Sequence, residues 1–394
     1  MKHVLIIPDG MGDLPTSELN GKTPVEQAET PHLDEISKNG HLGLCYTTPS
    51  GFPPGSDICI LSLIGYDPEI YYSGRAPLEA ASLNINMNPE DVIFRCNLIN
   101  LGPNQEIQDH SAGHISTEES REIILTLSEE LGTADLEFFP GVSYRNILVL
   151  KNKPNFKCDT TPPHDVPGQN YKDNLPHGKD AKILNDLMSR SIEILKDHPV
   201  NIQRKCNNKA TADMIWLWGG GYKPNMDNFY SKYGVKGAVI SAVDLIKGLA
   251  KVLDLDVLDV PGITAYFDTD YSSKGQYAAQ ALKKYDLVIV HIEAPDEAGH
   301  VGNVKEKIKA IENIDKYIIG PVYKHLSKEK EFRIMISPDH YTPVEKRIHM
   351  NYPVPFVICG KNIPKNGIIY SEKNAKKSEL IFLKGYELMS YFLK

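Results

Sequence analysis

The sequence has no paired-cysteine motif, no long apolar run and no excess of basic residues. Its six cysteines are scattered along the chain, and none belongs to a C-x-x-C pair. This distribution argues against a disulfide framework or a zinc knuckle and favours reduced thiols. The N-terminal apolar run, residues 4–7, is too short for a signal-peptide core, and no run is long enough to span a bilayer. We therefore expect a cytoplasmic protein without a membrane partner.

A formal net charge of −8 also excludes the basic footprint that a general nucleic-acid binder needs. An acidic surface still permits an anionic small-molecule substrate, because a local site can be positive. At 394 residues, with 41% hydrophobic residues, the chain can form one large α/β domain or a domain with a sizeable insertion. The sequence is compatible with a homo-oligomer but does not establish one.

Three short apolar runs are each followed by Asp or His. Each run is typical of a buried strand in a mostly parallel sheet, covered by helices on both faces. Ligands bind at the carboxyl edge of such sheets, so we expect these side chains to converge on one site. The runs and their polar followers are residues 4–7 with Asp9, residues 287–290 with Asp296 and His300, and residues 334–336 with Asp339 and His340.

The middle of the chain mixes helix-like and strand-like segments, a pattern that predicts an inserted α+β cap domain. A helix is expected over residues 117–131, after a Ser-Thr-Glu-Glu start that resembles a capping arrangement. Strands are expected at 146–150, 214–218 and 238–240. We therefore predict an α/β fold, a parallel sheet core sandwiched by helices, with core residues 1–108 and 209–394 flanking a cap of residues 109–208.

The candidate metal ligands combine hard carboxylate oxygens with borderline imidazole nitrogens. Such a mixture suits Mn²⁺ or Zn²⁺, and its size suffices for two ions. Two ions about 4 Å apart can stabilise both the attacking and the leaving oxygen of a phosphoryl displacement. The set consists of Asp9, Asp296, His300, Asp339, His340 and His349.

Ser56 is the candidate nucleophile. It stands in Pro-Pro-Gly-Ser-Asp, before a helix-like run at residues 58–64. A Pro-Gly turn into a helix exposes the hydroxyl beside free backbone N–H groups, which favour a phosphate. Metal coordination would lower the pKa of that hydroxyl and make it reactive. Singly, each of these residues is more often a turn or capping residue. Jointly, ligand chemistry at three strand ends favours a metal site.

In these residues the chain resembles the archaeal-type, cofactor-independent phosphoglycerate mutases of the alkaline phosphatase superfamily. The resemblance implies an alkaline-phosphatase-like core. It spans nearly the whole chain as an ordered series of short motifs. These are DGMGD at 9–13, GKTP at 21–24, PGSD at 54–57, GYDP at 65–68, GRAPLEA at 74–80, DEAGH at 296–300 and DHYTP at 339–343.

The resemblance assigns a role to each matching position. It implies isomerisation of 2-phosphoglycerate and 3-phosphoglycerate, a reaction of glycolysis, through phosphorylated Ser56. It also implies two divalent ions, with Mn²⁺ expected and Zn²⁺ or Co²⁺ as alternatives. One ion would be held by Asp9, Ser56, Asp339 and His340, and the other by Asp296, His300 and His349.

The chain departs from the resembled family where substrate specificity is expected. The family has an arginine-rich Asp-Arg-Arg-Ala-Gly-Arg stretch, whereas residues 109–114 read DHSAGH. A branch with this Ser-Ala-Gly-His pattern has been proposed to phosphorylate homoserine. The remaining candidates for binding a phosphorylated metabolite are Arg75, Arg95, His110, His114, Arg145, His164 and Lys274.

Three other functions stay open at this stage. A homoserine kinase would need ATP or another donor, and the sequence has no Walker-type phosphate loop. A metal-dependent phosphatase or phosphodiesterase would use water as the acceptor. A non-catalytic binding protein would be expected to lack a ligand or the nucleophile, and every position of the set is present.

Overall fold

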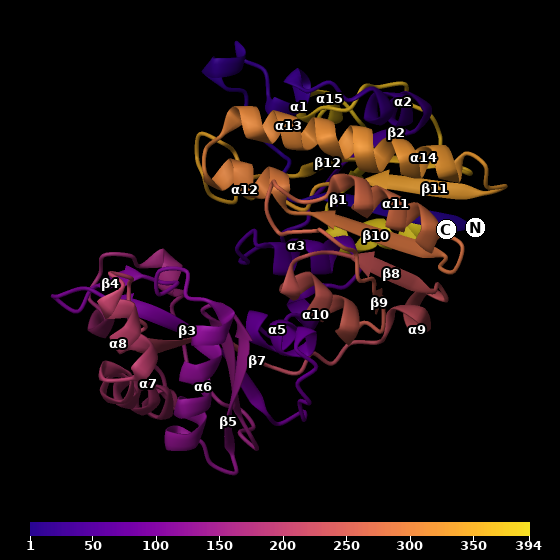
Figure 1. Ribbon diagram of the computed structural model, residues 1–394. Coiled ribbons are helices and arrows are strands. Elements are labelled where there is room, and N and C mark those ends of the chain that lie inside the picture. Colours follow the sequence, from indigo (N-terminus) through magenta and orange to yellow (C-terminus); the bar gives the residue numbers. More distant parts are fainter. The chain divides into compact units, whose positions relative to one another are not determined.

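The computed structural model describes residues 1–394, which divide into two compact units. Unit 1 comprises Met1–Tyr72 and Met226–Lys394, and unit 2 is the continuous segment Ser73–Asn225. Figure 1 shows the ribbon with its elements labelled. None of the helices combines the length and the apolar character needed to cross a membrane.

Unit 1 is built on an eight-stranded sheet with the order β13-β2-β12-β11-β1-β10-β8-β9. Pairings are parallel except those of β12 with β11 and β2, which are antiparallel. The strands are β1 Lys2–Pro8, β2 His41–Cys45, β8 Gly237–Ile240, β9 Asp256–Val257, β10 Leu287–Ile292, β11 Phe332–Ile336, β12 Val354–Gly360 and β13 Ile381–Phe382.

Helices cover both faces of this sheet, with α13 and α14 on one face and α3 and α10 on the other in Figure 1. The helices are α1 Pro24–Gln27, α2 Pro31–Asn39, α3 Ser56–Leu63, α4 Pro68–Tyr71, α9 Phe229–Tyr233, α10 Asp244–Val252, α11 Tyr271–Ala281, α12 Ala294–His300, α13 Val304–Ile314, α14 Gly320–Leu326, α15 Glu372–Ala375 and α16 Leu388–Leu393. Short 3-10 turns lie at Ser17–Leu19 and Gly385–Glu387, and a π-helical turn, Asp315–Ile319, joins α13 to α14.

The central strands are apolar on both faces, as the sequence predicts. Val4 and Ile6 of β1 pack in one core cluster with residues of α2, α11, α13 and α14. Leu5 and Ile7 point to the opposite face and are equally buried. Burial on both sides fixes β1, β10 and β11 side by side, so their carboxyl ends open onto the same edge. The predicted α/β class is confirmed.

Unit 2 contains a second, antiparallel sheet in which β3 Val92–Leu101 pairs with β4 Ile107–Asp109, β6 Arg145–Leu150 and β7 Met214–Tyr222. The edge strand β5 Leu136–Val142 pairs with β6. Its helices are α5 Arg75–Ser82, α6 Thr117–Leu131, α7 Ala181–Lys196 and α8 Pro199–Cys206, with 3-10 turns at Pro163–Asp165 and Tyr171–Asn174. Ser116 and Glu119 form the capping box that starts α6, at the predicted position.

The inserted unit is wider than the cap predicted at residues 109–208. It begins at Ser73 and ends at Asn225, so it includes β3 and β7, which the sequence had placed with the core. The reason is that these two strands pair with each other across more than a hundred residues. A strand pattern indicates an extended, half-buried segment but does not indicate which sheet the segment joins.

A buried lysine on α13 ties together the loops that carry the sheet's carboxyl edge. The Lys307 ammonium donates to the carbonyl oxygens of Gly10 at 2.9 Å, Gly12 at 3.3 Å and Thr342 at 2.8 Å. It also forms an ion pair with Asp13 at 2.8 Å, and both side chains are almost completely buried. One positive charge therefore fixes the loop after β1 to the loop after β11.

We expect Lys307→Met to destabilise unit 1 strongly. Removing one partner of a buried pair leaves Asp13 and three carbonyls without their donor, which should lower the free energy of unfolding by about 3–5 kcal/mol. Urea denaturation measures the loss. Lys309→Met is the matched control on the same helix, since its ion pair with Glu306 is exposed and is worth about 1 kcal/mol or less. Equal, small losses in the two variants would contradict the role assigned to Lys307.

Candidate metal centre

The carboxyl edge of the unit 1 sheet gathers three clusters of potential metal ligands. In each cluster the ligand atoms lie within 4.8 Å of one another. The first cluster is Asp9, Asp339 and His340; the second is Asp296, His300 and His349; the third is Asp9, His291 and Glu293. All six predicted Asp and His ligands fall within these clusters, and the first and third clusters share Asp9.

The first cluster is short of positive charge. Oδ1 of Asp9 and Oδ2 of Asp339 are buried and accept no hydrogen bond. His340 Nε2 lies 3.2 Å from the first oxygen and 3.4 Å from the second. Burial and the neighbouring carboxylates of Asp339 and Asp296 raise the pKa of Asp9 well above its usual range. Buried oxygens without donors, facing an imidazole nitrogen, fit a divalent cation.

The second cluster converges on Asp296. His300 Nε2 lies 3.2 Å from Oδ2 of Asp296, and His349 Nε2 lies 3.4 Å from Oδ1. The two Nε2 atoms are 2.9 Å apart, so both rings are directed at the same point. Although burial lowers it, the hydrogen bond with Asp296 raises the pKa of His300 to about 9. Two imidazoles and one carboxylate are a donor set that suits Zn²⁺ or Mn²⁺ and leaves coordination positions open.

Hydrogen bonds behind these rings select the histidine tautomer. The Thr342 hydroxyl donates to Asp296 Oδ1, so it can only accept from Nδ1 of His340, 3.2 Å away. His300 Nδ1 faces the carbonyl oxygen of Arg347 at 3.0 Å and must donate to it. In both rings Nδ1 is therefore the donor to the protein, so Nε2 is the nitrogen that faces the cluster and that a metal ion would bind, directly or by displacing a proton.

His291 and Glu293 are site residues that the sequence-based prediction missed. His291 Nε2 lies 2.8 Å from Oδ2 of Asp9 and 3.5 Å from Glu293. Burial and the Asp9 charge raise the pKa of Glu293 well above its usual range. The available signal was their spacing, because polar residues two apart at the end of a buried strand point to the same face.

Ser56, the predicted nucleophile, lies against the first cluster. Its Oγ is 3.3 Å from Asp9 Oδ2 and 3.2 Å from His340 Nε2. It is the first residue of α3, where backbone N–H groups have no acceptor earlier in the helix. The next residue, Asp57, is fixed by its own hydrogen bond from the Tyr72 hydroxyl at 2.5 Å. The helix start thus holds the hydroxyl between an imidazole and a carboxylate.

Three of the predicted substrate-binding residues form an arginine cluster in unit 2. Arg75 and Arg95 both pair with Glu79, at 3.3 Å and 2.9 Å. Burial would raise the pKa of Glu79, but the charges of Arg95, Arg75 and Arg145 outweigh it and lower the pKa. Arg95 also stacks on the Trp218 ring, 4.2 Å from its centre. Arg145 is exposed beside the Tyr144 ring.

The cap histidines border this arginine cluster. The His164 ring packs edge-on against His110 at 6.1 Å and Trp218 at 5.2 Å. Burial, with the nearby Arg75 and Arg95, lowers the pKa of His164 to about 4, so the ring is neutral at pH 7. His114 is exposed and makes no ring contact with the other two.

Lys274 does not join the arginine cluster. It belongs to unit 1, where its buried ammonium donates to the carbonyl oxygen of His291 at 3.1 Å. Burial lowers the pKa of Lys274 to about 8, partly opposed by Glu293. Its contacts with His291 and Glu293 indicate that it supports the third cluster.

Comparison with known proteins gives the same family along the whole chain. The profile of the 2,3-bisphosphoglycerate-independent phosphoglycerate mutase family matches residues 37–201. The protein of that name from Methanosarcina acetivorans is 45% identical over 397 residues, covering 100% of both chains. A relative from Methanothermobacter thermautotrophicus, named 2,3-bisphosphoglycerate-independent phosphoglycerate mutase 2, is also 45% identical and covers 100% of this chain and 97% of its own.

Solved structures share the fold. A Pyrococcus horikoshii protein superposes with a TM-score of 0.84 at 30% identity, covering 100% of this chain and 96% of its own. The cofactor-independent phosphoglycerate mutase from Thermoplasma acidophilum gives a TM-score of 0.67 at 27% identity, covering 100% and 99%. With full-length relatives at 45% identity, this chain belongs to the 2,3-bisphosphoglycerate-independent phosphoglycerate mutase family.

Proposed function

We propose that this enzyme interconverts 2-phosphoglycerate and 3-phosphoglycerate through phosphorylated Ser56, with two Mn²⁺ ions. The observation that carries the proposal is the position of the Ser56 hydroxyl, within 3.3 Å of Asp9 and 3.2 Å of His340. The second cluster shares the same edge of the sheet and supplies the ligands for the other ion. Relatives that match the whole chain carry the name of this activity.

The reaction needs two displacements at phosphorus. In the first, Ser56 Oγ forms a bond to the substrate phosphorus while the bond from phosphorus to one glycerate oxygen breaks, and the proton lost by Ser56 balances the one that the departing glycerate oxygen gains. In the second, the other glycerate hydroxyl attacks the phosphoserine and loses its proton, the bond from phosphorus to Ser56 Oγ breaks, and Ser56 regains a proton. Divalent ions bound by these clusters would lower the pKa of the hydroxyl and neutralise charge on the phosphoryl oxygens. Thr342 and Arg347 hold His340 and His300 so that their Nε2 atoms are directed at that space.

The proposed substrate-anion site is the arginine cluster of unit 2. Glu79 is shared by Arg75 and Arg95, so the group keeps a positive excess that Arg145 increases. Guanidinium groups bind carboxylate and phosphate oxygens in a bidentate manner, which suits both ends of phosphoglycerate. His110, His114 and His164 are proposed to shape this site, with His164 contributing no charge at pH 7.

The homoserine kinase alternative has no support among the relatives described here, which are named as phosphoglycerate mutases. The chemistry of Ser56 would nevertheless serve a different acceptor equally well. The substrate therefore has to be tested directly.

We expect purified, metal-free enzyme reloaded with Mn²⁺ to convert 3-phosphoglycerate to 2-phosphoglycerate, and to be less active with Zn²⁺ or Co²⁺. Enolase-coupled absorbance measures the rate. A parallel reaction with homoserine and ATP should yield no O-phosphohomoserine by ³¹P NMR. Homoserine phosphorylation without mutase turnover would replace the proposed function, and inorganic phosphate as the main product would indicate a phosphatase.

Ser56→Ala should abolish phosphoryl transfer while the protein stays folded. Loss of a nucleophile costs on the order of 10⁴-fold or more in kcat. Acid-quenched reactions with ³²P-labelled substrate should label the wild-type protein but not the variant. The matched control is Ser62→Ala on the same helix, whose buried hydroxyl makes no hydrogen bond. A Ser56→Ala variant that still becomes labelled would place the nucleophile elsewhere.

Arg145→Ala should weaken substrate binding more than turnover. A charge-assisted hydrogen bond contributes about 1.5–3 kcal/mol, so KM should rise roughly tenfold or more while kcat changes little. Arg121→Ala is the control, an exposed arginine on α6 of the same unit. An unchanged KM in the Arg145 variant would show that this guanidinium does not contact the substrate.

A further inference from the structure

A serine, a histidine and an aspartate form a buried chain of contacts across three neighbouring strands of unit 1. Ser241 directly follows β8, His291 lies in β10, and Asp9 directly follows β1. His291 Nδ1 is 3.1 Å from Ser241 Oγ, and His291 Nε2 is 2.8 Å from Asp9 Oδ2. None of the three residues is more than 1% exposed. Nε2 can either offer a lone pair to a third cation or donate a proton to Asp9, and these roles need opposite tautomers.

Ser241 selects between the two tautomers. Its Oγ accepts a hydrogen bond from the Val243 N–H at 3.0 Å. Its own proton has His291 Nδ1 as acceptor, and a buried hydroxyl that cannot donate loses the free energy of that hydrogen bond. A proton on Nδ1 would leave the Ser241 hydroxyl without an acceptor. Nδ1 is therefore the accepting nitrogen, and the ring carries its proton on Nε2.

The hydroxyl behind His340 has the opposite role. The Thr342 proton is used on Asp296, so the Thr342 oxygen accepts from His340 Nδ1. The Ser241 oxygen accepts a backbone N–H instead, and its proton goes to His291. Two buried hydroxyls thus leave Nε2 of His340 available to a metal ion and make Nε2 of His291 a donor.

The donor from His291 divides the Asp9 carboxylate into a held oxygen and an open one. Oδ2 accepts from His291 at 2.8 Å, whereas the Glu293 carboxyl is farther from the same nitrogen, at 3.5 Å. Oδ1 accepts no hydrogen bond and lies 3.2 Å from His340 Nε2. Fixing Oδ2 therefore sets the plane of the carboxylate so that Oδ1 faces the first cluster.

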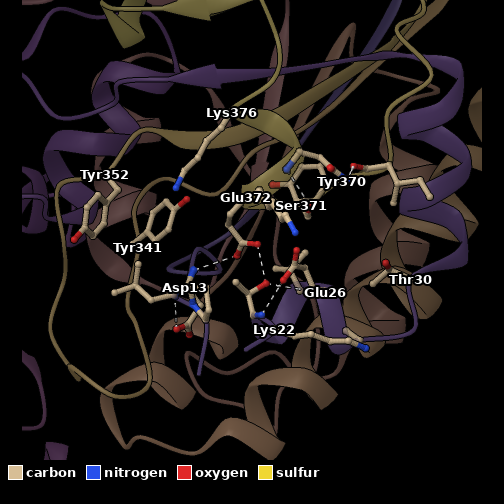
Figure 2. A pocket seen from close by; sticks show the side chains of 18 of the residues that line it. Asp13, Lys22, Glu26, Thr30, Tyr341, Tyr352, Tyr370, Ser371, Glu372 and Lys376 are labelled. Atoms are coloured by element: carbon tan, nitrogen blue, oxygen red, sulfur yellow. Dashed lines mark hydrogen bonds between the residues drawn. The ribbon is translucent and has the colours of Figure 1, made fainter. Parts of the chain in front are cut away.

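The other contacts of this loop hold its backbone. Figure 2 shows Asp13, whose N–H donates to Glu372 at 3.2 Å. Lys307 donates to the carbonyl oxygen of Gly10. Neither contact reaches the Asp9 carboxylate, so they fix where the loop runs but not how that carboxylate is turned.

The Ser56 hydroxyl does reach the carboxylate, 3.3 Å from Oδ2. In the proposed reaction, however, this hydroxyl gives up its proton when Ser56 is phosphorylated. The N–H of His291 takes no part in either displacement, so it holds Asp9 at both stages of the reaction.

We propose that His291 is a positioning residue for Asp9, and that the third cluster is a hydrogen-bonding network rather than a third metal site. Without the lone pair of His291, that cluster keeps only the carboxyl groups of Asp9 and Glu293, and Asp9 already belongs to the first cluster. The inference rests on the metal centre of the proposed function and adds the group that orients one of its ligands.

The test is isothermal titration calorimetry of Mn²⁺ into metal-free enzyme, without substrate. The wild-type chain should bind two ions. His291→Leu should weaken one of the two dissociation constants roughly 10- to 100-fold, the usual cost of losing a group that orients a metal ligand. His291→Gln should retain most of the affinity, because its side-chain amide still supplies an N–H to Asp9.

Two further variants separate positioning from a general loss of packing. Ser241→Ala should weaken the same constant severalfold, and should add nothing to His291→Leu, because Ser241 acts through His291. His3→Leu is the matched control, a buried imidazole in β1, the strand that leads to Asp9, with no hydrogen bond at either nitrogen. It should bind Mn²⁺ like the wild type.

A third Mn²⁺ ion on the wild-type chain, or a loss in His291→Gln as large as in His291→Leu, would show that Nε2 is a ligand and would overturn the proposal. Equal affinities in wild type and His291→Leu would overturn it as well. Urea denaturation shows whether each variant is folded; if His291→Leu is not, His291→Gln and Ser241→Ala decide. An enzyme with the expected Mn²⁺ affinities that does not isomerise phosphoglycerate would refute the proposed function alone.

Discussion

The crowding of buried carboxylates at one edge of the sheet is the constraint on which the site depends. Asp9, Asp339 and Asp296 end or follow three adjacent strands, and Glu293 lies beside them. Burial and mutual repulsion raise the pKa of Asp9 and of Glu293. A fold can hold such a group only where positive charge is supplied. Lys274 lies beside Glu293 and supplies part of it, and the open oxygens of Asp9 and Asp339 fit divalent cations.

Hydrogen bonds behind the metal-ligand side chains fix how these side chains are oriented. Thr342 holds His340 and Asp296 with one hydroxyl, while its own carbonyl oxygen accepts from Lys307. A ligand geometry set by two successive hydrogen bonds does not depend on the metal for its orientation. Gly10 permits the close approach of these loops, because its φ is positive and a Cβ would collide with Asp296 and Thr342.

The sequence alone predicts the features that depend on short stretches of neighbouring residues. The apolar strands β1, β10 and β11, the capped helix α6 and the polar residues at the strand ends were all visible in the order of residue types. It could not predict that β3 and β7 pair with each other, because pairing over a long separation leaves no local trace. His291 was hidden for a related reason, since it stands inside a run that reads as a plain buried strand.

The loss of the family's cap arginines need not remove the capacity to bind phosphoglycerate. Arg75, Arg95 and Arg145 carry three guanidinium groups against the single carboxylate of Glu79, which leaves two positive charges. Where the resembled family has arginines, residues 110, 111 and 114 are His, Ser and His, which lowers the charge around this group without removing the group itself. Ser56 and the clustered carboxylates belong to unit 1 and the arginine cluster to unit 2, so the residues proposed for reactivity and those proposed for specificity are separate sets.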